Sequence, residues 1–379
     1  MTNRKRLRLS LFLPSFAGGG AERVMIGIAN DLVSRKYEID FVVGCDEGVF
    51  REEINPTINV INLNRSRMLS NLWPLVRYFR TRRPLACLSS IMHANVICAS
   101  AARLSCTDVR VVLRESGSPE LSNDRPLTEG HSPMLRLARL VYPRADAVVA
   151  VSTGILKEIS ETLKLPSDLT QRVILNPVDF NQLSTSARKP ATSLFGQSNN
   201  DDLKIISVGR LSPEKGYDTL VRAVARVAQT TPIQLLLLGE GPQRDTLQQL
   251  AHDLGVTQLV YMPGFVRNPF PHILEADIFI SSSYSEGMPN ALIQAMGLGK
   301  KTLCTKFRNG PLPDISYAGR PSSISPDDPI AMAKSIIHLS QQPDWDNPPN
   351  DWYSRFSAAK IVDSYLKLLI PETTHTGNR

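Results

Sequence analysis

The chain alternates short apolar runs with segments of helical periodicity, and it does so in both halves. In the first half the expected strands are 7–13, 39–43, 86–90, 110–114 and 147–151. In the second half they are 204–208, 234–238, 259–262, 278–281 and 301–304. Helix-like segments lie between them, such as 21–34, in which Val24, Ile28 and Leu32 share one face. Repeated strand–helix units build parallel sheets covered by helices, so the sequence predicts an α/β fold.

Two domains are expected, because 379 residues exceed what one hydrophobic core usually organises. Residues 180–202 are rich in Ser, Asn, Pro and Lys without a sustained apolar period, which indicates a linker. We therefore assign a first Rossmann-like domain to 1–182 and a second to 183–355. The last periodic segment, 356–371, is expected to form a helix that can pack back on the first domain, although the sequence does not decide between the two domains.

Composition places the chain among globular proteins, with 42% hydrophobic and 21% charged residues. No apolar run approaches the roughly 20 residues that a membrane-spanning helix needs. The cysteines form no CxxC pair and show no zinc-binding spacing with histidine; they are Cys45, Cys87, Cys98, Cys106 and Cys304. We therefore expect free thiols in a cytoplasmic protein. HExxH, GxSxG and Walker motifs do not occur, which argues against zinc hydrolases, esterases and P-loop enzymes.

Positive charge is concentrated in residues 54–107, which contain seven arginines and no acidic residue. Within 65–83, one helical face can collect the apolar residues Leu69, Leu72, Trp73, Val76 and Phe79. Two interpretations remain open: a basic amphipathic helix that binds an anionic membrane surface, peripherally at the inner face of the cell membrane, or a helix packed on a sheet with solvated arginines. Nucleic acid is not an expected partner, because no recognition motif accompanies the charge.

Two cations follow the first expected strand of the second half. Gly209 and Arg210 come directly after the run 204–208, and Lys215 follows in a short turn that ends at Gly216. Ligands of doubly wound domains bind beyond the carboxyl ends of the strands. Arg210 and Lys215 can therefore hold a diphosphate between them. Ordinary strand-to-loop turns with a solvated lysine are the alternative interpretation.

A second motif, 285–296, follows the expected strand 278–281 and opens a helix. Its Glu286 can accept hydrogen bonds from sugar hydroxyl groups while the two cations hold phosphates, or it can cap the helix dipole instead. The backbone N–H groups at the start of this helix face the same sheet edge. Further substrate-binding candidates are therefore Gly287, Met288, Pro289 and Asn290.

The first half has a glycine-rich turn after its first expected strand. Gly18, Gly19 and Gly20 separate that strand from a helix, where the backbone can approach a phosphate or an acceptor closely. A full GxGxxG pattern with a later ribose-binding acid is lacking, so an ordinary dinucleotide site is not expected. We take Gly19 and Gly20 as substrate-binding candidates.

Two other strand ends of the first half carry polar residues. His93 lies just after the expected strand 86–90, where it is either a functional contact or a structural histidine. Arg114 and Glu115 lie at the end of the expected strand 110–114. They are either a substrate contact or a local ion pair.

Six motifs, in order, resemble those of the retaining glycosyltransferases of family 4. They are GGGAER (18–23), ADAVVAVS (145–152), VILNPVD (173–179), GRL (209–211), EKG (214–216) and EGMPN (286–290). The resemblance covers most of the chain and implies the GT-B architecture, in which two Rossmann-like domains with parallel sheets face a central cleft. It also implies that Arg210 and Lys215 bind the donor diphosphate, that Glu286 contacts the donor sugar, and that His93 is an active-site residue.

One position departs from the family pattern. The family has a second glutamate eight positions after the first, usually bound to the donor ribose, and here that position is Gln294. A glutamine can accept a hydrogen bond from a hydroxyl, but without the charge that strengthens such a bond. Gln294 is therefore a substrate-binding candidate from which weaker donor binding is expected.

Together these features predict a retaining hexosyltransferase that needs no metal or other cofactor. It would move a sugar from a nucleoside diphosphate sugar to a glycan or lipid-linked saccharide in cell-surface polysaccharide biosynthesis. No metal site is assigned to Asp344-Trp345-Asp346, because this DxD triplet lies in a Pro/Asn-rich loop rather than after a strand. Two alternatives stay open: a sugar-nucleotide epimerase on the same architecture, and a catalytically silent sugar-nucleotide-binding subunit, which Gln294 motivates.

Overall fold

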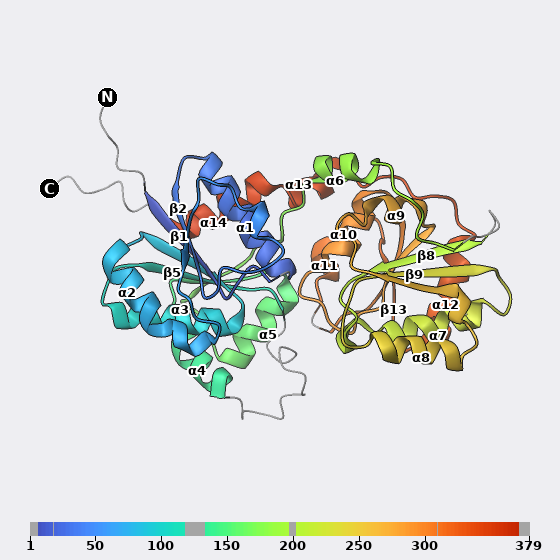
Figure 1. Cartoon of the computed structure of the whole chain (residues 1–379), viewed down its shortest axis with the longest axis horizontal. Coiled ribbons are helices and arrows are strands. Elements are labelled where there is room, and N and C mark those ends of the chain that lie inside the picture. The colour runs from blue at the N-terminus through green and yellow to red at the C-terminus, as the bar shows by residue number, and fades with distance from the viewer. Residues whose placement is uncertain (1–6, 18, 118–132, 197–201, 309, 371–379) are drawn as a thin grey trace. The chain divides into compact units, whose positions relative to one another are not determined.

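The computed structural model describes residues 7–17, 19–117, 133–196, 202–308 and 310–370. The chain divides into two compact units (Figure 1). Unit 1 comprises Met1–Pro177 and Phe356–Arg379, and unit 2 comprises Val178–Arg355. Each unit is a parallel sheet flanked by helices, which confirms the predicted α/β fold class.

Unit 1 has a seven-stranded sheet in the order β3-β2-β1-β4-β5-β6-β7. Its strands are β1 (Arg8–Leu13), β2 (Glu38–Val43), β3 (Asn59–Asn62), β4 (Ala86–Ser90), β5 (Arg110–Glu115), β6 (Ala147–Ala150) and β7 (Thr170–Val173). All neighbours in it pair in parallel. The five strands predicted for the first half are confirmed, and β3 and β7 are edge strands that the prediction missed.

Helices cover both faces of this sheet, because successive strand residues point to opposite sides. Phe12 and Val42 pack with one set of helices, and the adjacent Leu11 and Phe41 pack with the other. The first set is α2 (Leu72–Arg82), α3 (Met92–Ser105), α4 (Pro133–Val141) and α5 (Thr153–Leu163). The second set is α1 (Gly20–Ser34) and α14 (Ala358–Leu369).

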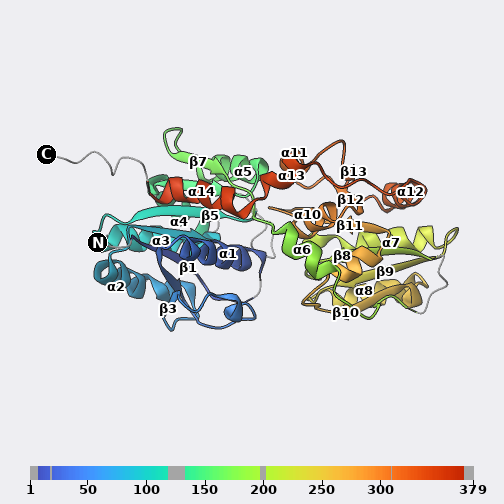
Figure 2. The same cartoon turned by 90° about the horizontal axis from the view of Figure 1, so that it is seen from above.

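The last helix, α14, belongs to unit 1 although it follows unit 2 in the sequence (Figure 2). It packs beside α1, where Asp363 pairs with Arg35. Its buried face joins the core around Leu9 and Met25 and consists of Ile361, Val362, Tyr365, Leu368 and Leu369. The hydrophobic core of unit 1 therefore includes the end of the described chain.

Unit 2 has a six-stranded sheet in the order β10-β9-β8-β11-β12-β13. Its strands are β8 (Leu203–Val208), β9 (Ile233–Leu238), β10 (Val260–Gly264), β11 (Ile278–Ser281), β12 (Lys301–Thr305) and β13 (Ser322–Ile324). Its helices are α6 (Phe180–Ala187), α7 (Tyr217–Val227), α8 (Arg244–Asp253), α9 (Phe270–Glu275), α10 (Asn290–Gly297), α11 (Leu312–Ile315), α12 (Pro329–Ser340) and α13 (Asn350–Arg355). The five strands predicted for the second half are confirmed, and the short β13 was missed.

The start of the predicted linker is a helix rather than an irregular segment. Asp179 caps α6 by accepting a hydrogen bond from the Gln182 N–H at 2.9 Å. Phe180 packs on the rings of Trp352 and Tyr353, with centroids 5.6 and 4.8 Å away. The apolar period of this helix is too short to stand out among its polar neighbours. The boundary proposed at 182/183 falls inside α6, whereas the units divide between Pro177 and Val178.

Candidate active site

The carboxyl edge of the unit 2 sheet contains a reversal of strand order. The chain runs from β8 through β9 to β10, and then returns to β11 on the other side of β8. In open α/β sheets, ligands bind outside the carboxyl ends of the strands at such a point. Gly209 and Arg210 follow β8, and Ser282 begins the loop that follows β11. The donor-site residues predicted from the sequence therefore meet at this point.

Lys215 and Glu286 form an ion pair there. The Lys215 Nζ atom donates to Glu286 Oε1 at 2.6 Å, and the Ser283 hydroxyl donates to the same oxygen at 2.7 Å. The side chains of the pair are 22% and 12% exposed, so both remain accessible from solvent. Lys215, which is predicted to bind the donor diphosphate, is thus in direct contact with Glu286, which is predicted to bind the donor sugar.

The loops that carry this pair are bonded to each other. Gly216 has a φ of 59°, and an added Cβ would lie 2.3 Å from the Ser282 carbonyl oxygen, so a glycine is needed here. The Ser282 hydroxyl donates to the Lys215 carbonyl at 2.8 Å. The Tyr284 N–H donates to the Glu214 carbonyl at 2.8 Å. These contacts hold both charged groups in one geometry before any ligand binds.

The charges at this edge favour an anion. Burial lowers the pKa of Lys215, but Glu286 together with Tyr217 and Glu214 raises it by more in total, so this pKa lies above its ordinary value. Arg210 is exposed, and its guanidinium makes no hydrogen bond or ion pair within the described residues. Because Glu286 pairs with Lys215, the Arg210 guanidinium is the cation at this edge that is available to a phosphate group.

The helix α10 follows this pair and contains the other unit 2 candidates. Pro289 is its N-cap residue and makes no side-chain cap bond. Met288 is buried, whereas Gly287 and Asn290 are partly exposed. Gln294 lies one turn into the helix and is half-buried.

The unit 1 sheet has its own reversal of strand order, between β1 and β4. Gly19 follows β1 as the N-cap residue of α1, and Gly20 begins that helix. Gly18 lies outside the described residues. His93 is in the first turn of α3, directly after β4. Both predicted elements of unit 1 thus lie at the carboxyl edge of its sheet.

The backbone beside His93 is in an unusual conformation. Ile91, between β4 and α3, has a φ of 79°, a value that β-branched residues rarely adopt. Such residues concentrate at functional sites, where the surrounding structure maintains the strain. Burial lowers the pKa of His93, so its imidazole is neutral at neutral pH and can donate or accept one hydrogen bond.

Two family profiles match successive parts of the chain and together take in most of it. The profile described as Glycosyltransferase Family 4 matches residues 18–182, and the profile described as Glycosyl transferases group 1 matches residues 202–342. The chain belongs to this glycosyltransferase family. The family implied by the sequence motifs is thereby confirmed.

Curated relatives of this glycosyltransferase extend over most of its length. A Campylobacter jejuni N-acetylgalactosamine-N,N'-diacetylbacillosaminyl-diphospho-undecaprenol 4-alpha-N-acetylgalactosaminyltransferase is 26% identical and aligns with 80% of this chain and 82% of its own. A lipopolysaccharide core biosynthesis glycosyltransferase of Rhizobium meliloti is 26% identical, over 93% of this chain and 96% of its own.

Solved structures share the fold of this glycosyltransferase. The crystal structure of Anabaena HepE in complex with UDP-glucose has a TM-score of 0.75 at 19% identity, covering 96% of this chain and 99% of that chain. Sucrose-phosphate synthase from Thermosynechococcus elongatus has a TM-score of 0.74 at 17% identity, covering 96% and 98%. These likenesses confirm the GT-B fold class.

Two residues of the glycosyltransferase that were predicted as substrate contacts, Arg114 and Glu115, lie in the interior of unit 1. Arg114 is 0% exposed, and it donates to the Ser90 hydroxyl at 2.9 Å and to Asn176 Oδ1 at 2.6 Å. Glu115 is 3% exposed and accepts hydrogen bonds from Tyr142 and from Asn95, the latter at 2.9 Å. Arg114 and Glu115 are therefore parts of a buried polar network, and their role as a substrate contact stays a prediction.

Sequence reasoning missed the polar residues that support Glu286. Ser282 and Ser283 bond to the Lys215 carbonyl and the Glu286 carboxylate, respectively. The signal was the run Ser281-Ser282-Ser283, which begins at the last residue of β11 and continues into the loop at the reversal of strand order. A serine run is common in loops, so this signal alone does not select these residues.

The described residues contain neither a cluster of metal-binding side chains nor a helix that could cross a membrane. Within those ranges, no group of three or more His, Cys, Asp or Glu side chains could hold a metal ion. Asp344, of the DxD triplet, is highly exposed and lies 3.6 Å from Lys301 Nζ. Among the helices that the structure describes, none combines the length and the apolar character that crossing a membrane requires.

Proposed function

We propose that this glycosyltransferase moves a hexosyl group, with retention of configuration, from a nucleoside diphosphate sugar to a saccharide or lipid-linked saccharide acceptor. The observation that carries the proposal is the Lys215–Glu286 pair, fixed beside Arg210 at the reversal of strand order. It provides cations for a diphosphate and a carboxylate for a sugar at one edge. Support comes from the Anabaena relative, solved with UDP-glucose.

The curated relatives support the acceptor class and the biological setting that we propose. One is named for transfer to a diphospho-undecaprenol-linked saccharide, and another for biosynthesis of the lipopolysaccharide core. Both names refer to saccharides joined to a lipid. We therefore assign this chain to cell-surface polysaccharide biosynthesis at the cytoplasmic face of the membrane.

In the proposed reaction, Arg210 and Lys215 stabilise the negative charge that develops on the leaving diphosphate. Glu286 accepts hydrogen bonds from the donor sugar. Its hydrogen bonds to Lys215 and Ser283 both go to Oε1, which leaves Oε2 for a sugar hydroxyl. His93 takes part as an active-site residue, as the family resemblance implies. No step requires a metal ion.

A panel of nucleotide sugars tests the function. The true donor should raise the thermal unfolding temperature in proportion to its occupancy, and the other sugars should not. Product analysis then follows with donor alone and with donor plus acceptor, each with and without EDTA. Transfer that needs an acceptor and persists in EDTA supports the proposal. Isomerisation of the donor alone would identify an epimerase, and loss of transfer in EDTA would refute metal independence.

Gln294→Glu should tighten donor binding. A hydrogen bond from a ribose hydroxyl to a carboxylate is stronger than one to an amide by about 1 kcal/mol, which corresponds to about fivefold in Kd. Calorimetric titration with the donor measures this, with Gln248→Glu on the exposed face of α8 as a charge-matched control. Binding by the wild type without turnover, and turnover only after Gln294→Glu, would establish the silent-subunit alternative.

Transfer should decline on acidification because of His93. Burial lowers the pKa of this histidine, so it stays neutral through neutral pH and becomes charged only below its ordinary value of about 6.5. His93→Gln cannot titrate in this range and should lower kcat by about tenfold, which corresponds to one lost hydrogen bond. The kcat profile from pH 5 to 8 checks this, and an acid limb that is unchanged in His93→Gln would contradict it.

Membrane association is proposed for residues 65–83, where Leu69 and Trp73 are exposed beside arginines. Arg80 donates to the Leu104 and Ser105 carbonyls at the end of α3, so it has a structural role. The test variant therefore combines Arg77→Ser, Arg82→Ser and Arg83→Asn.

The variant should lose flotation with anionic liposomes, and the wild type should not float with neutral ones. A control of equal charge change combines Arg188→Ser, Arg222→Ser and Arg226→Ser in unit 2, all of them exposed. If flotation depends neither on lipid charge nor on Arg77, Arg82 and Arg83, the interpretation as a packed helix with solvated arginines holds.

A further inference from the structure

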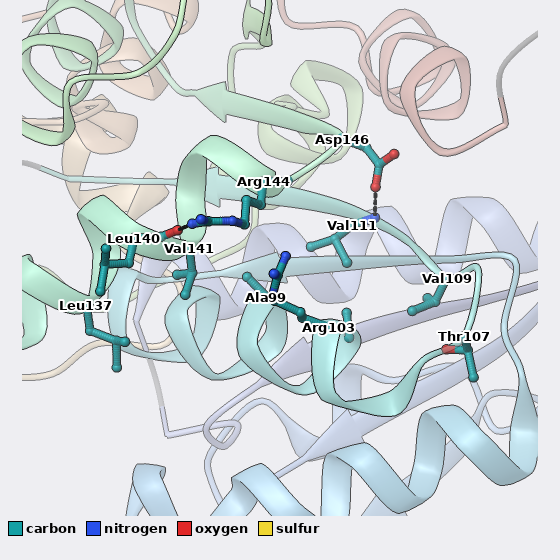
Figure 3. Close-up of a pocket in the computed structure, with 12 residues that line it drawn as sticks. Ala99, Arg103, Thr107, Val109, Val111, Leu137, Leu140, Val141, Arg144 and Asp146 are labelled. Atoms are coloured by element: carbon teal, nitrogen blue, oxygen red, sulfur yellow. Dashed lines mark hydrogen bonds between the residues drawn. The ribbon is translucent and has the colours of Figure 1, made fainter.

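A pocket of about 490 Å³ opens into unit 1 between α3 and α4 (Figure 3). This volume is within the usual range for small-molecule sites, about 300–1,000 Å³. Its floor includes Val109 and Val111 at the start of β5, and Ala145 just before β6. His93 instead follows the carboxyl end of β4. The pocket therefore lies at the opposite edge of the sheet from the candidate active-site residues of unit 1.

The interior of the pocket is apolar. Ala99 and Ala102 face it from α3, and Leu137 and Val141 face it from α4. Ala102, Val109, Val111 and Ala145 are each below 10% exposed and belong to the hydrophobic core of the unit. The alanines leave space that larger side chains would fill. Such walls suit a hydrocarbon chain, because burying it removes apolar surface from water.

Two exposed arginines line the same pocket. The guanidinium of Arg103 makes no hydrogen bond or ion pair with any described part of the chain. Arg144 donates one N–H to the Leu140 carbonyl. Figure 3 shows both between the leucines of α4 at one end and Thr107 with Val109 at the other.

The one acidic residue of the lining, Asp146, is already compensated. It accepts from the Val111 N–H at 2.7 Å and from Arg110 at 3.2 Å. The charge left over at the pocket is therefore positive. Apolar side chains also continue outside it, since Leu104 is 42% and Leu140 is 60% exposed.

We propose that this pocket binds a single-chain amphiphile with an anionic headgroup, at a site separate from that of sugar transfer. The alkyl chain lies on the alanine and valine walls, and the headgroup oxygens accept hydrogen bonds from Arg103 and Arg144. Charge-assisted bonds from guanidinium groups to phosphate are among the stronger polar contacts in proteins. An apolar interior with a cationic margin selects a ligand that has both properties.

Dodecyl phosphate, titrated calorimetrically below its micelle concentration, is the probe. We expect one molecule to bind per chain, and inorganic phosphate and dodecanol each to bind at least tenfold more weakly. Arg103→Ser with Arg144→Ser should weaken dodecyl phosphate binding at least tenfold. Ala102→Phe, which fills the pocket, should do the same. The arginine variant alters only exposed side chains, so it remains informative if Ala102→Phe fails to fold.

A control variant with Arg222→Ser and Arg226→Ser removes the same charge from the exposed surface of unit 2 and should bind dodecyl phosphate as the wild type does. Unchanged affinity in the Arg103/Arg144 variant, or uptake of many molecules per chain, would overturn the proposal. So would equal affinity for inorganic phosphate. If that variant instead lost flotation with anionic vesicles while it kept dodecyl phosphate binding, the arginines would belong to a bilayer-binding surface and the pocket assignment would be wrong.

Discussion

Lys215→Ala is expected to lower kcat/KM for sugar transfer by about 100- to 1,000-fold, the usual effect of removing one preorganised donor to a developing negative charge. The Lys215 ammonium is fixed by Glu286 at 2.6 Å, and the pKa of Lys215 is raised, so the full charge is present throughout the neutral range. Steady-state kinetics with the identified donor and acceptor measure the loss. Lys334→Ala, at an exposed position of α12, is the matched control.

Glu286→Ala should reduce transfer to a similar extent, and the double variant distinguishes two roles. If Glu286 only positions Lys215, the double variant is no worse than Lys215→Ala. If Glu286 also bonds to the sugar, as we propose, the double variant is slower than either single one. Near-normal turnover in both single variants, with unchanged thermal unfolding, would remove the donor site from this sheet edge.

Glu115→Gln is expected to stabilise unit 1 at alkaline pH. Burial raises the pKa of Glu115 from about 4.5 to about 7, and this exceeds the opposing effects of Tyr142, Asn95 and the Arg114 charge. A carboxyl whose pKa is higher in the folded state gives stability that is fully present below pH 4.5. That stability is lost as the pH rises through 7. A shift of this size corresponds to about 3 kcal/mol.

The free energy of unfolding of the wild type should therefore fall by about that amount, relative to Glu115→Gln, between pH 4.5 and 8. The glutamine carbonyl can still accept the hydrogen bonds from Tyr142 and Asn95. Amide hydrogen exchange of peptides from β5 follows unit 1 separately from unit 2. Glu161→Gln, on the surface of α5, is the control, and an equal pH dependence in wild type and Glu115→Gln would contradict the prediction.

The central strands could be predicted from the sequence, but of the four edge strands in the described sheets only β10 could. Central strands such as β9 are buried on both faces, so their sequence is one apolar run. The edge strands β3, β7 and β13 have the sequences NVIN, TQRV and SSI. An edge strand pairs on one side and is partly exposed, so little selects for apolar residues. Their pairing depends on a neighbouring strand and not on their own composition.

The sequence also predicts only part of the candidate site, because it does not show which strand-end side chains are exposed. Gly209, Arg210 and Lys215 could be predicted as site residues because they follow a parallel strand. Ligands of open α/β sheets bind at the carboxyl ends of the strands, which gives the edge where these residues meet. Arg114 and Glu115 have the same signal, yet both are buried. Whether a strand-end side chain points outward or into the unit depends on the packing of distant residues. For Arg114 such a residue is Asn176, 62 positions away.

The return of α14 to unit 1 has a consequence for synthesis of the protein. Domains generally fold as units in the order in which they are made. Here the core around Leu9 and Met25 lacks Tyr365 and Leu369 until almost the whole chain has been translated. Unit 2, complete at Arg355, has all its residues before unit 1 does. The core of unit 1, whose strands are made first, therefore depends on α14, which is made last. A ribosome that stops within unit 2 releases a chain in which the core of unit 1 cannot be completed.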